Sequence, residues 1–155
     1  MSALKQFRHK GGFRQLLQVL EISDSAKQKG LLQLIALEDP GWAHLLKLKI
    51  MTVERILSWA PPFLQQALVP IPVETLFQLY AGCGESQRKQ IDMAVPPDFR
   101  RDLRERLNRE SPPTSQAVFM AGVKLIQTVR ELENMGTLDL EQVDPSLCWE
   151  PDLVA

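Results

Sequence analysis

Residues 96–110 read PPDFRRDLRERLNRE and predict a short, densely charged helix. Phe99, Leu103 and Leu107 recur at i, i+4 and i+8, so they form one apolar stripe along that helix. A charged face of this kind is either a solvated surface or a docking surface for a charged partner. On a solvated face, ion pairs one helical turn apart are expected at Arg101–Glu105, Asp102–Arg106 and Glu105–Arg109.

Helix signals on the N-terminal side of this stretch predict that the chain is all-α, and we find no credible strand. Asp39 is typical of an N-cap and Pro40 of a first helical position. Thr52 is a further N-cap. Other helices are expected over residues 13–22, 73–81 and 85–93, after Ser23 or Asp24, and from Pro61-Pro62.

A last, long helix is expected on the C-terminal side of the charged one. Ser111 is expected to cap it, with Pro112 or Pro113 near its first position. It should end at Asn134, with Gly136 in the C′ position that favours glycine. In total, about nine short helices joined by tight turns predict a stacked helical superhelix rather than a long four-helix bundle.

The composition is that of an ordinary soluble chain with a core large enough to fold: 155 residues, 45% hydrophobic and 24% charged. No apolar run approaches the roughly 18 residues that a membrane span needs. The N-terminus, MSALKQFRHK, lacks the apolar segment of a secretory signal. Cys83 and Cys148 lie 65 positions apart without metal-type spacing, and we expect reduced thiols of a cytoplasmic protein.

The charges are unevenly distributed along the chain. Residues 137–155 contain five acidic residues and no Lys or Arg, which leaves 18 basic against 14 acidic residues in the remainder, a net +4. This charge is too small and too interspersed to indicate nucleic-acid binding. The acidic tail, TLDLEQVDPSLCWEPDLVA, also carries regularly placed apolar residues. It either folds back on the basic body, docks a partner or is a frayed terminus.

Motifs of catalysis and cofactor binding are absent from the sequence. There is no Gly-rich phosphate loop, HExxH, GxSxG or CxxC. His9 lies in a basic segment and His44 has no acidic or cysteine neighbour at ligand spacing, so both are read as surface or boundary histidines. We therefore expect no enzyme activity, no cofactor, no metal and no small-molecule substrate.

Read as a whole, residues 11–138 resemble the C-terminal portion of the flagellar motor-switch protein FliG. Gly11-Gly12 resembles the linker of that family, and Glu38-Asp39-Pro40 its acidic turn into the next helix. Residues 49–54 fall on its Met-Phe-x-Phe hinge, and residues 130–136 close the match. Further matches in the same order are Gln65, Leu68, Glu74, Leu76, Arg88, Leu103, Arg104, Glu105, Leu107 and Pro112.

The resemblance implies an all-α fold, in which an armadillo-like right-handed helical superhelix precedes a compact helical terminal domain. The implied divisions are an N-terminal basic segment 1–10, an armadillo-like unit 11–49, a hinge 50–53, a FliG-like terminal domain 54–136 and an acidic tail 137–155.

The function implied is that of a structural or switch component of the bacterial flagellar motor, which transmits torque or switches the direction of rotation. Its partners would be flagellar switch or stator components, or another copy of the chain. Its location would be cytoplasmic, at the inner face of the membrane only through a motor complex. The charged helix would carry the partner contact, through Asp98, Arg101, Arg104, Glu105 and Arg106.

The implied hinge, Ile50, Met51, Thr52 and Val53, departs from the family pattern. Ile50 and Met51 replace a Met-Phe pair, and Val53 replaces the second Phe. Smaller side chains bury less apolar surface, so they would loosen or re-tune the hinge.

The charged helix also departs from the family pattern. Glu105-Arg106 stands where the family has two aspartates, and Asp98 where it has arginine. Reversed charges turn attraction into repulsion, which favours a second interpretation: a FliG-like adaptor that binds another protein outside the motor. A helical domain like the N-terminal domain of MgtE-type magnesium transporters is a third possibility, against which the lack of a membrane span counts.

A stacking surface is also implied, because in the family another subunit covers the armadillo-like unit. The residues expected to include both core positions and an exposed stacking patch are Phe13, Leu17, Leu20, Leu31, Ile35 and Trp42. Alternatively, a helix over Met1–His9 covers this patch within the same chain, through Leu4 and Phe7.

Overall fold

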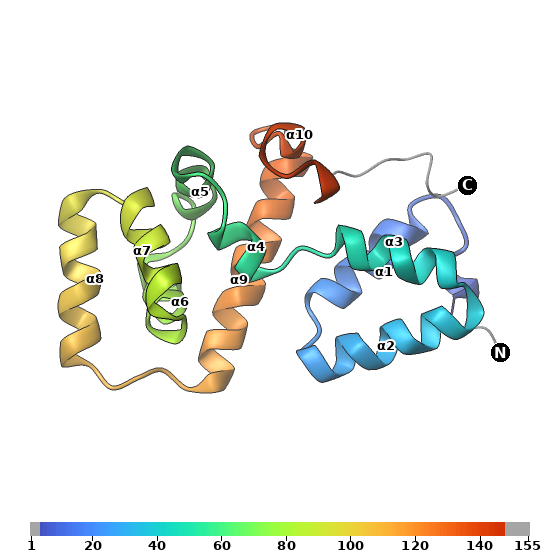
Figure 1. Ribbon diagram of the computed structural model, residues 1–155, viewed down its shortest axis with the longest axis horizontal. Coiled ribbons are helices and arrows are strands. Elements are labelled where there is room, and N and C mark those ends of the chain that lie inside the picture. The colour runs from blue at the N-terminus through green and yellow to red at the C-terminus, as the bar shows by residue number, and fades with distance from the viewer. Residues whose placement is uncertain (1–3, 148–155) are drawn as a thin grey trace. The chain divides into compact units, whose positions relative to one another are not determined.

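The computed structural model describes residues 4–147, which form α-helices, two short 3₁₀ turns and no strand (Figure 1). The predicted all-α class is confirmed. The described chain divides into two compact units. Unit 1 contains residues 4–51 and 140–147, and unit 2 contains residues 52–139.

Unit 1 is built around α1, α2 and α3. Its elements are η1 (Lys5–Phe7), α1 (Gly12–Glu21), α2 (Ser25–Glu38), α3 (Pro40–Lys49), α10 (Leu140–Val143) and η2 (Pro145–Leu147). At its centre the rings of Phe13 and Trp42 meet edge to face, with centroids 5.3 Å apart. Leu20 and Leu46, both fully buried, belong to the same apolar cluster.

Local capping explains where the helices of unit 1 begin. The Asp39 carboxylate accepts a hydrogen bond from the Trp42 N–H at 3.1 Å, and Pro40 occupies the first helical position as predicted. Asp24 caps α2 in the same way, accepting from the Lys27 N–H at 2.8 Å. These short side chains satisfy backbone donors that a helix leaves unpaired at its start.

Unit 2 contains α4 to α9. Their bounds are α4 (Val53–Leu57), α5 (Pro61–Leu68), α6 (Val73–Gly82), α7 (Glu85–Ala94), α8 (Pro97–Arg109) and α9 (Ser115–Asn134). The long α9 packs against α4, α5 and α6, and α8 packs against α6. Fully buried Tyr80, Ile91 and Leu125 lie in the helices of this unit.

The start of α9 differs from the prediction. Residues 111–114 have no helical conformation, and Thr114, not Ser111, is the N-cap, accepting from the Ala117 N–H at 3.1 Å. Each proline disfavours a helical conformation in the residue before it, so two consecutive prolines keep Ser111 and Pro112 extended. The helix therefore begins at Ser115.

The end of α9 is the one predicted. Gly136 adopts φ +75°, a conformation that glycine takes without a Cβ penalty. Its N–H donates to the Glu133 carbonyl at 3.1 Å, and the Thr137 N–H donates to the Leu132 carbonyl at 3.0 Å. This pair of bonds is a Schellman motif, which turns the chain out of the helix.

The tail predicted over residues 137–155 is not a separate element in the part of the chain that the structure describes. Leu138 belongs to unit 2, whereas residues 140–147 belong to unit 1, where η2 packs against α3. Leu140 and Leu147 are 2% and 1% exposed. The described part of the tail, residues 137–147, thus packs on the rest of the chain, while residues 148–155, including Cys148, lie outside the described residues.

Candidate functional site

The charged helix α8 turns its apolar stripe into unit 2, as predicted. Leu103 is buried, and Phe99 and Leu107 are half-buried. The charged side chains around this stripe fall into two groups. Some form ion pairs with acidic residues inside unit 2, and the others face solvent.

Arg104 is held inside unit 2 by two acidic side chains of α7. Its guanidinium donates through Nη1 to Glu85 Oε1 at 2.9 Å and through Nη2 to Asp92 Oδ2. The Tyr80 hydroxyl donates to the other Asp92 oxygen at 3.0 Å, and the Arg104 guanidinium lies 5.4 Å from the centre of the Tyr80 ring. This network ties α6, α7 and α8 together.

The electrostatics of this cluster follow from its contacts. Burial and the hydrogen bond to Asp92 raise the pKa of the Tyr80 hydroxyl, so tyrosine stays neutral. The hydrogen bonds that Arg104 donates to Asp92 and Glu85 raise the pKa of Arg104, and the bond to Glu85 lowers the pKa of that carboxyl. Arg104 and Glu85 are therefore both stabilised in their ionised forms.

Arg106 is also engaged within the unit. It donates through Nε to Glu110 Oε2 at 2.5 Å and through Nη2 to Glu74 Oε2 at 3.0 Å. Its guanidinium lies 4.0 Å from the centre of the Phe77 ring, a cation–π contact. Arg106 thus connects α8 to α6 and is only 21% exposed.

The predicted ion pairs along α8 are wrong. Among residues 4–147, Asp102, Glu105 and Arg109 make no ion pair within 4.0 Å. The pairs formed within the helix itself are Arg101–Asp98 at 3.4 Å and Arg106–Glu110. Helical spacing alone did not predict the pairing: Arg106 pairs with Glu74 of α6 and with Glu110, and Arg101 pairs with Asp98 instead of Glu105.

The five residues predicted to bind a partner therefore separate into two groups. Asp98, Arg101 and Glu105 face solvent, with the Asp98 and Arg101 side chains 91% and 68% exposed. Arg104 and Arg106 belong to the internal networks just described.

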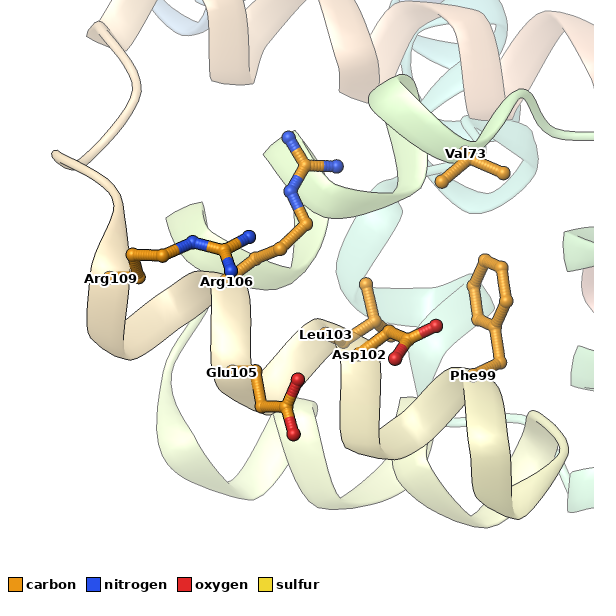
Figure 2. Close-up of a pocket in the computed structure, with 7 residues that line it drawn as sticks. All are labelled: Val73, Phe99, Asp102, Leu103, Glu105, Arg106 and Arg109. Atoms are coloured by element: carbon orange, nitrogen blue, oxygen red, sulfur yellow. The ribbon is translucent and has the colours of Figure 1, made fainter.

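A groove of about 330 Å³ runs along this face of α8 (Figure 2). Phe99 and Val73 lie at one end, while the Arg106 and Arg109 side chains extend side by side at the other (Figure 2). Asp102, Leu103 and Glu105 complete the lining. The prediction missed Asp102 and Arg109, although their spacing from Arg106 would have placed them on its face; no sequence signal marked Val73.

Replacing Arg104 with alanine should lower the free energy of unfolding of unit 2 by about 1.5–3 kcal/mol, because it leaves the half-buried Asp92 carboxylate without its cationic partner. Replacing the exposed Arg101 should change it by less than about 0.5 kcal/mol. Urea unfolding of the two variants measures both values. Equal effects would contradict the internal role of Arg104.

The predicted hinge residues are each anchored in one unit. Ile50 and Met51 are buried, and the buried Glu21 carboxylate accepts a hydrogen bond from the Met51 N–H at 2.8 Å. The division between the units falls after Met51, and Thr52 caps α4 with a 3.2 Å bond from the Arg55 N–H. Glu21 was missed by the prediction, although an acidic residue between Leu20 and Ile22 is an available signal.

Val53, the last predicted hinge residue, belongs to unit 2. It is the first residue of α4, and its Cγ2 lies 3.0 Å from where a Cβ on Gly122 of α9 would stand. Val53 therefore packs closely against the α9 backbone. Whether residues 50–53 act as a switch stays a prediction.

The prediction that these six residues include an exposed stacking patch is wrong, because none of them is exposed. Phe13, Leu17, Leu20, Ile35 and Trp42 are at most 8% exposed, and Leu31 is half-buried. All six belong to the apolar cluster of unit 1 or pack against it. The large apolar side chains exposed on α2 are instead Leu34 and Leu37, at 54% and 84%.

The alternative, a cover supplied by the same chain, holds in part: Leu4 and Phe7 pack on the cluster, but Lys5–Phe7 is a short 3₁₀ turn, not a helix over Met1–His9, and residues 1–3 lie outside the described residues. Leu4 is 1% exposed, and Phe7 packs against the cluster. Arg8 lies 4.5 Å from the centre of the Trp42 ring and donates to Asp39 Oδ2 at 2.6 Å. The approach is so close that a Cβ on residue 12 would stand 1.8 Å from the Phe7 carbonyl oxygen, which requires glycine there.

The Arg8–Asp39 contact predicts a pH dependence for unit 1. The hydrogen bond from Arg8 lowers the pKa of the Asp39 carboxyl in the folded chain. A depressed pKa stabilises the fold above the unfolded value, near 3.9, and this contribution disappears as pH falls through the folded pKa. The difference in urea midpoint between the wild type and Asp39→Asn should therefore shrink from pH 7 to pH 2.5. A constant difference would contradict the ionic contribution.

Other chemistry is sparse in the part of the chain that the structure describes. Residues 4–147 contain no group of three or more His, Cys, Asp or Glu that could hold a metal ion. Burial raises the pKa of the Cys83 thiol to about 11, so it is protonated at neutral pH. None of the described helices combines the length and the apolar character needed to cross a membrane.

Comparison with known proteins agrees with this arrangement of helices. The family model described as the FliG C-terminal domain matches residues 33–140, from within α2 to the first residue of α10. No curated protein matches the sequence significantly. Because the match covers more than half of the 155 residues, the chain belongs to the FliG C-terminal domain family.

Proposed function

We propose that this protein is a FliG-like structural component of the bacterial flagellar motor that contacts another motor protein through the exposed face of α8. Membership of the family supports the motor assignment. We further propose that it works on the cytoplasmic side of the motor, in torque transmission or in reversing the direction of rotation. Its partners would be switch or stator components.

One observation supports the partner contact: internal ion pairs hold α8 in place, while some of its outward-facing charges form no ion pair among residues 4–147. Arg104 and Arg106 hold the helix against α6 and α7. Asp102 and Glu105 stand on the same helix without an ion pair, among residues 4–147, and line the groove. Charges on a helix that is already held in place bind a partner without the cost of ordering the backbone that carries them.

The charge pattern favours a second candidate function, that of an adaptor outside the motor. Arg106 replaces an acidic residue of the family pattern and is engaged with Glu74 and Glu110. A partner that binds two adjacent acidic side chains would meet only one of them here, Glu105, because residue 106 is arginine. A different partner would then use the same groove.

Photo-crosslinking in the source cell separates the two functions. A photoreactive amino acid replaces Glu105 in the groove, and a matched control replaces Ser86, an exposed residue of α7. Adducts to a switch or stator protein from position 105, and not from position 86, would support the motor assignment. Adducts only to proteins outside the motor would overturn it in favour of the adaptor.

A charge reversal gives a second readout. Glu105→Arg should reduce the motility that the wild-type gene restores to a deletion strain, because it reverses an unpaired charge on the contact face. Ser86→Arg should restore motility fully. Equal motility for both variants would contradict a contact through α8.

A further inference from the structure

The groove along α8 has an apolar end. Val73, the first residue of α6, is 54% exposed there, and the half-buried ring of Phe99 lies next to it (Figure 2). Buried Leu103 lines the groove between the two helices. The volume of about 330 Å³ is at the small end of the range of about 300–1,000 Å³ for ligand pockets. The groove therefore has room for a few side chains of a partner.

Charged side chains continue the groove beyond its apolar end. Asp102 and Glu105 follow Phe99 after three and six residues, about 4.5 and 9 Å along the helix axis, and Arg109 follows after ten, about 15 Å. These three charged residues are exposed and form no ion pair within 4.0 Å among residues 4–147. Arg106 already pairs with two glutamates of the same unit. The groove thus presents apolar, acidic and basic chemistry, in that order.

We propose that this groove binds a partner helix that carries an apolar side chain, a Lys or Arg one turn further on, and an acidic residue about two turns beyond it. The apolar side chain packs against Val73 and Phe99. The basic one pairs with Asp102 and Glu105, and the acidic one with Arg109. The inference rests on the proposed function for the use of α8 as a contact face, and it adds the chemistry of the segment that binds there.

The surroundings of the groove favour a helix over an extended peptide. Residues 4–147 contain no strand, so an extended segment would find no sheet edge with which to pair its backbone. A helix bonds its own backbone groups and presents side chains at i and i+4 on one face. Positions i, i+4 and i+11 of such a helix match the spacing of the three parts of the groove.

The two kinds of contact have different tasks. Exposed ion pairs add little affinity and are screened by salt, whereas burial of an apolar side chain does not depend on charge. The charged residues of the groove therefore set the direction and register of the partner helix, and the apolar end anchors it. Contact through this face is then not purely electrostatic.

Synthetic peptides test the proposal with the purified full-length chain. The probe is a lactam-bridged helical peptide of Ala and Gln with Leu, Lys and Glu at positions i, i+4 and i+11. The control peptide exchanges the Lys and the Glu. Fluorescence anisotropy should show the probe binding at least about tenfold more tightly, because the control sets like charges against each other. Equal binding of the two peptides, or binding of neither, would overturn the proposal.

A pair of valines tests the apolar anchor. Val73→Asn alters the groove, and Val69→Asn is the matched control, since Val69 is 74% exposed and does not line the groove. Val73→Asn should weaken probe binding about fivefold at both low and high NaCl concentration, because the lost contact is apolar. Val69→Asn should leave binding unchanged. Equal effects of the two variants, or a Val73→Asn effect that disappears at high salt, would refute the apolar anchor.

Neutralising the acids tests the charged part of the groove separately. The double variant Asp102→Asn, Glu105→Gln should reduce the preference for the probe over the control peptide to about twofold or less, because exposed ion pairs are lost with little change of shape. A preference that survives would contradict the assignment of the basic side chain to these acids. Failure here is distinct from failure of the proposed function, since peptide binding needs no motor protein, whereas crosslinks from position 105 identify the protein bound in the cell.

Discussion

Replacing Phe13 with alanine should lower the free energy of unfolding of unit 1 by about 3–5 kcal/mol, the usual cost of removing a fully buried phenylalanine. The lost ring leaves a cavity beside Trp42, whose ring meets Phe13 edge to face with centroids 5.3 Å apart, because the surrounding core relaxes only partially. This loss is comparable to the whole stability of a small domain. We therefore expect unit 1 to unfold at much lower urea concentration.

Hydrogen exchange followed by mass spectrometry measures this effect unit by unit. Protection should fall in α1, α2 and α3, while the core of unit 2 stays protected, because the two units have separate interiors. Leu37→Ala is the matched control, since Leu37 is 84% exposed and its truncation should cost less than about 0.5 kcal/mol. If Phe13→Ala and Leu37→Ala behaved alike, Phe13 would not be a core residue.

Replacing Gly82 with alanine should lower the free energy of unfolding of unit 2 by about 1–3 kcal/mol, the cost of overpacking a close contact. A Cβ on Gly82, at the end of α6, would stand 2.5 Å and 2.6 Å from the two Cγ atoms of Val118 on α9. A β-branched side chain has little rotamer freedom in a helix, so Val118 cannot move aside. The loss in the free energy of unfolding would therefore come from poorer packing of α6 against α9.

A double-mutant cycle isolates this contact. Val118→Ala removes both Cγ atoms, so we expect a favourable coupling energy with Gly82→Ala of at least about 1 kcal/mol. Gly30→Ala is the control for the general effect of alanine in a helix. A Cβ there meets nothing within 4 Å, so the change should stabilise by about 0.5–1 kcal/mol. Destabilisation by Gly82→Ala that persists unchanged in the Val118→Ala background would refute the steric argument.

The caps show how much of the fold was predictable. Asp39 caps α3 with the bond to Trp42 that the sequence predicts, and Gly136 ends α9 in the predicted left-handed conformation. Both interactions lie within five residues along the chain, so local sequence contains all their partners. The start of α9 was missed, because Ser111 and Thr114 are both good caps and only the two prolines decide between them.

The candidate site was less predictable than the helices. The sequence placed Asp98, Arg101 and Glu105 on an exposed face, where the structure has them. It did not show that Arg104 pairs with Glu85 and Asp92, or that Arg106 pairs with Glu74, because these acids lie 12 to 32 positions away. Only the packing of α6, α7 and α8 brings such groups together.

The sequence by itself determined most of the α-helices, many of their ends and the stripe of α8, because each depends on interactions within one or two turns. The tertiary structure decided which face of a helix is buried when both faces are apolar. In α2, Ile35 is buried while Leu34 and Leu37 are exposed, although all three are equally hydrophobic. Leu4 is buried in the same core, and Phe7 packs against it, because contacts between segments distant in the sequence decide which of several equally apolar faces is buried.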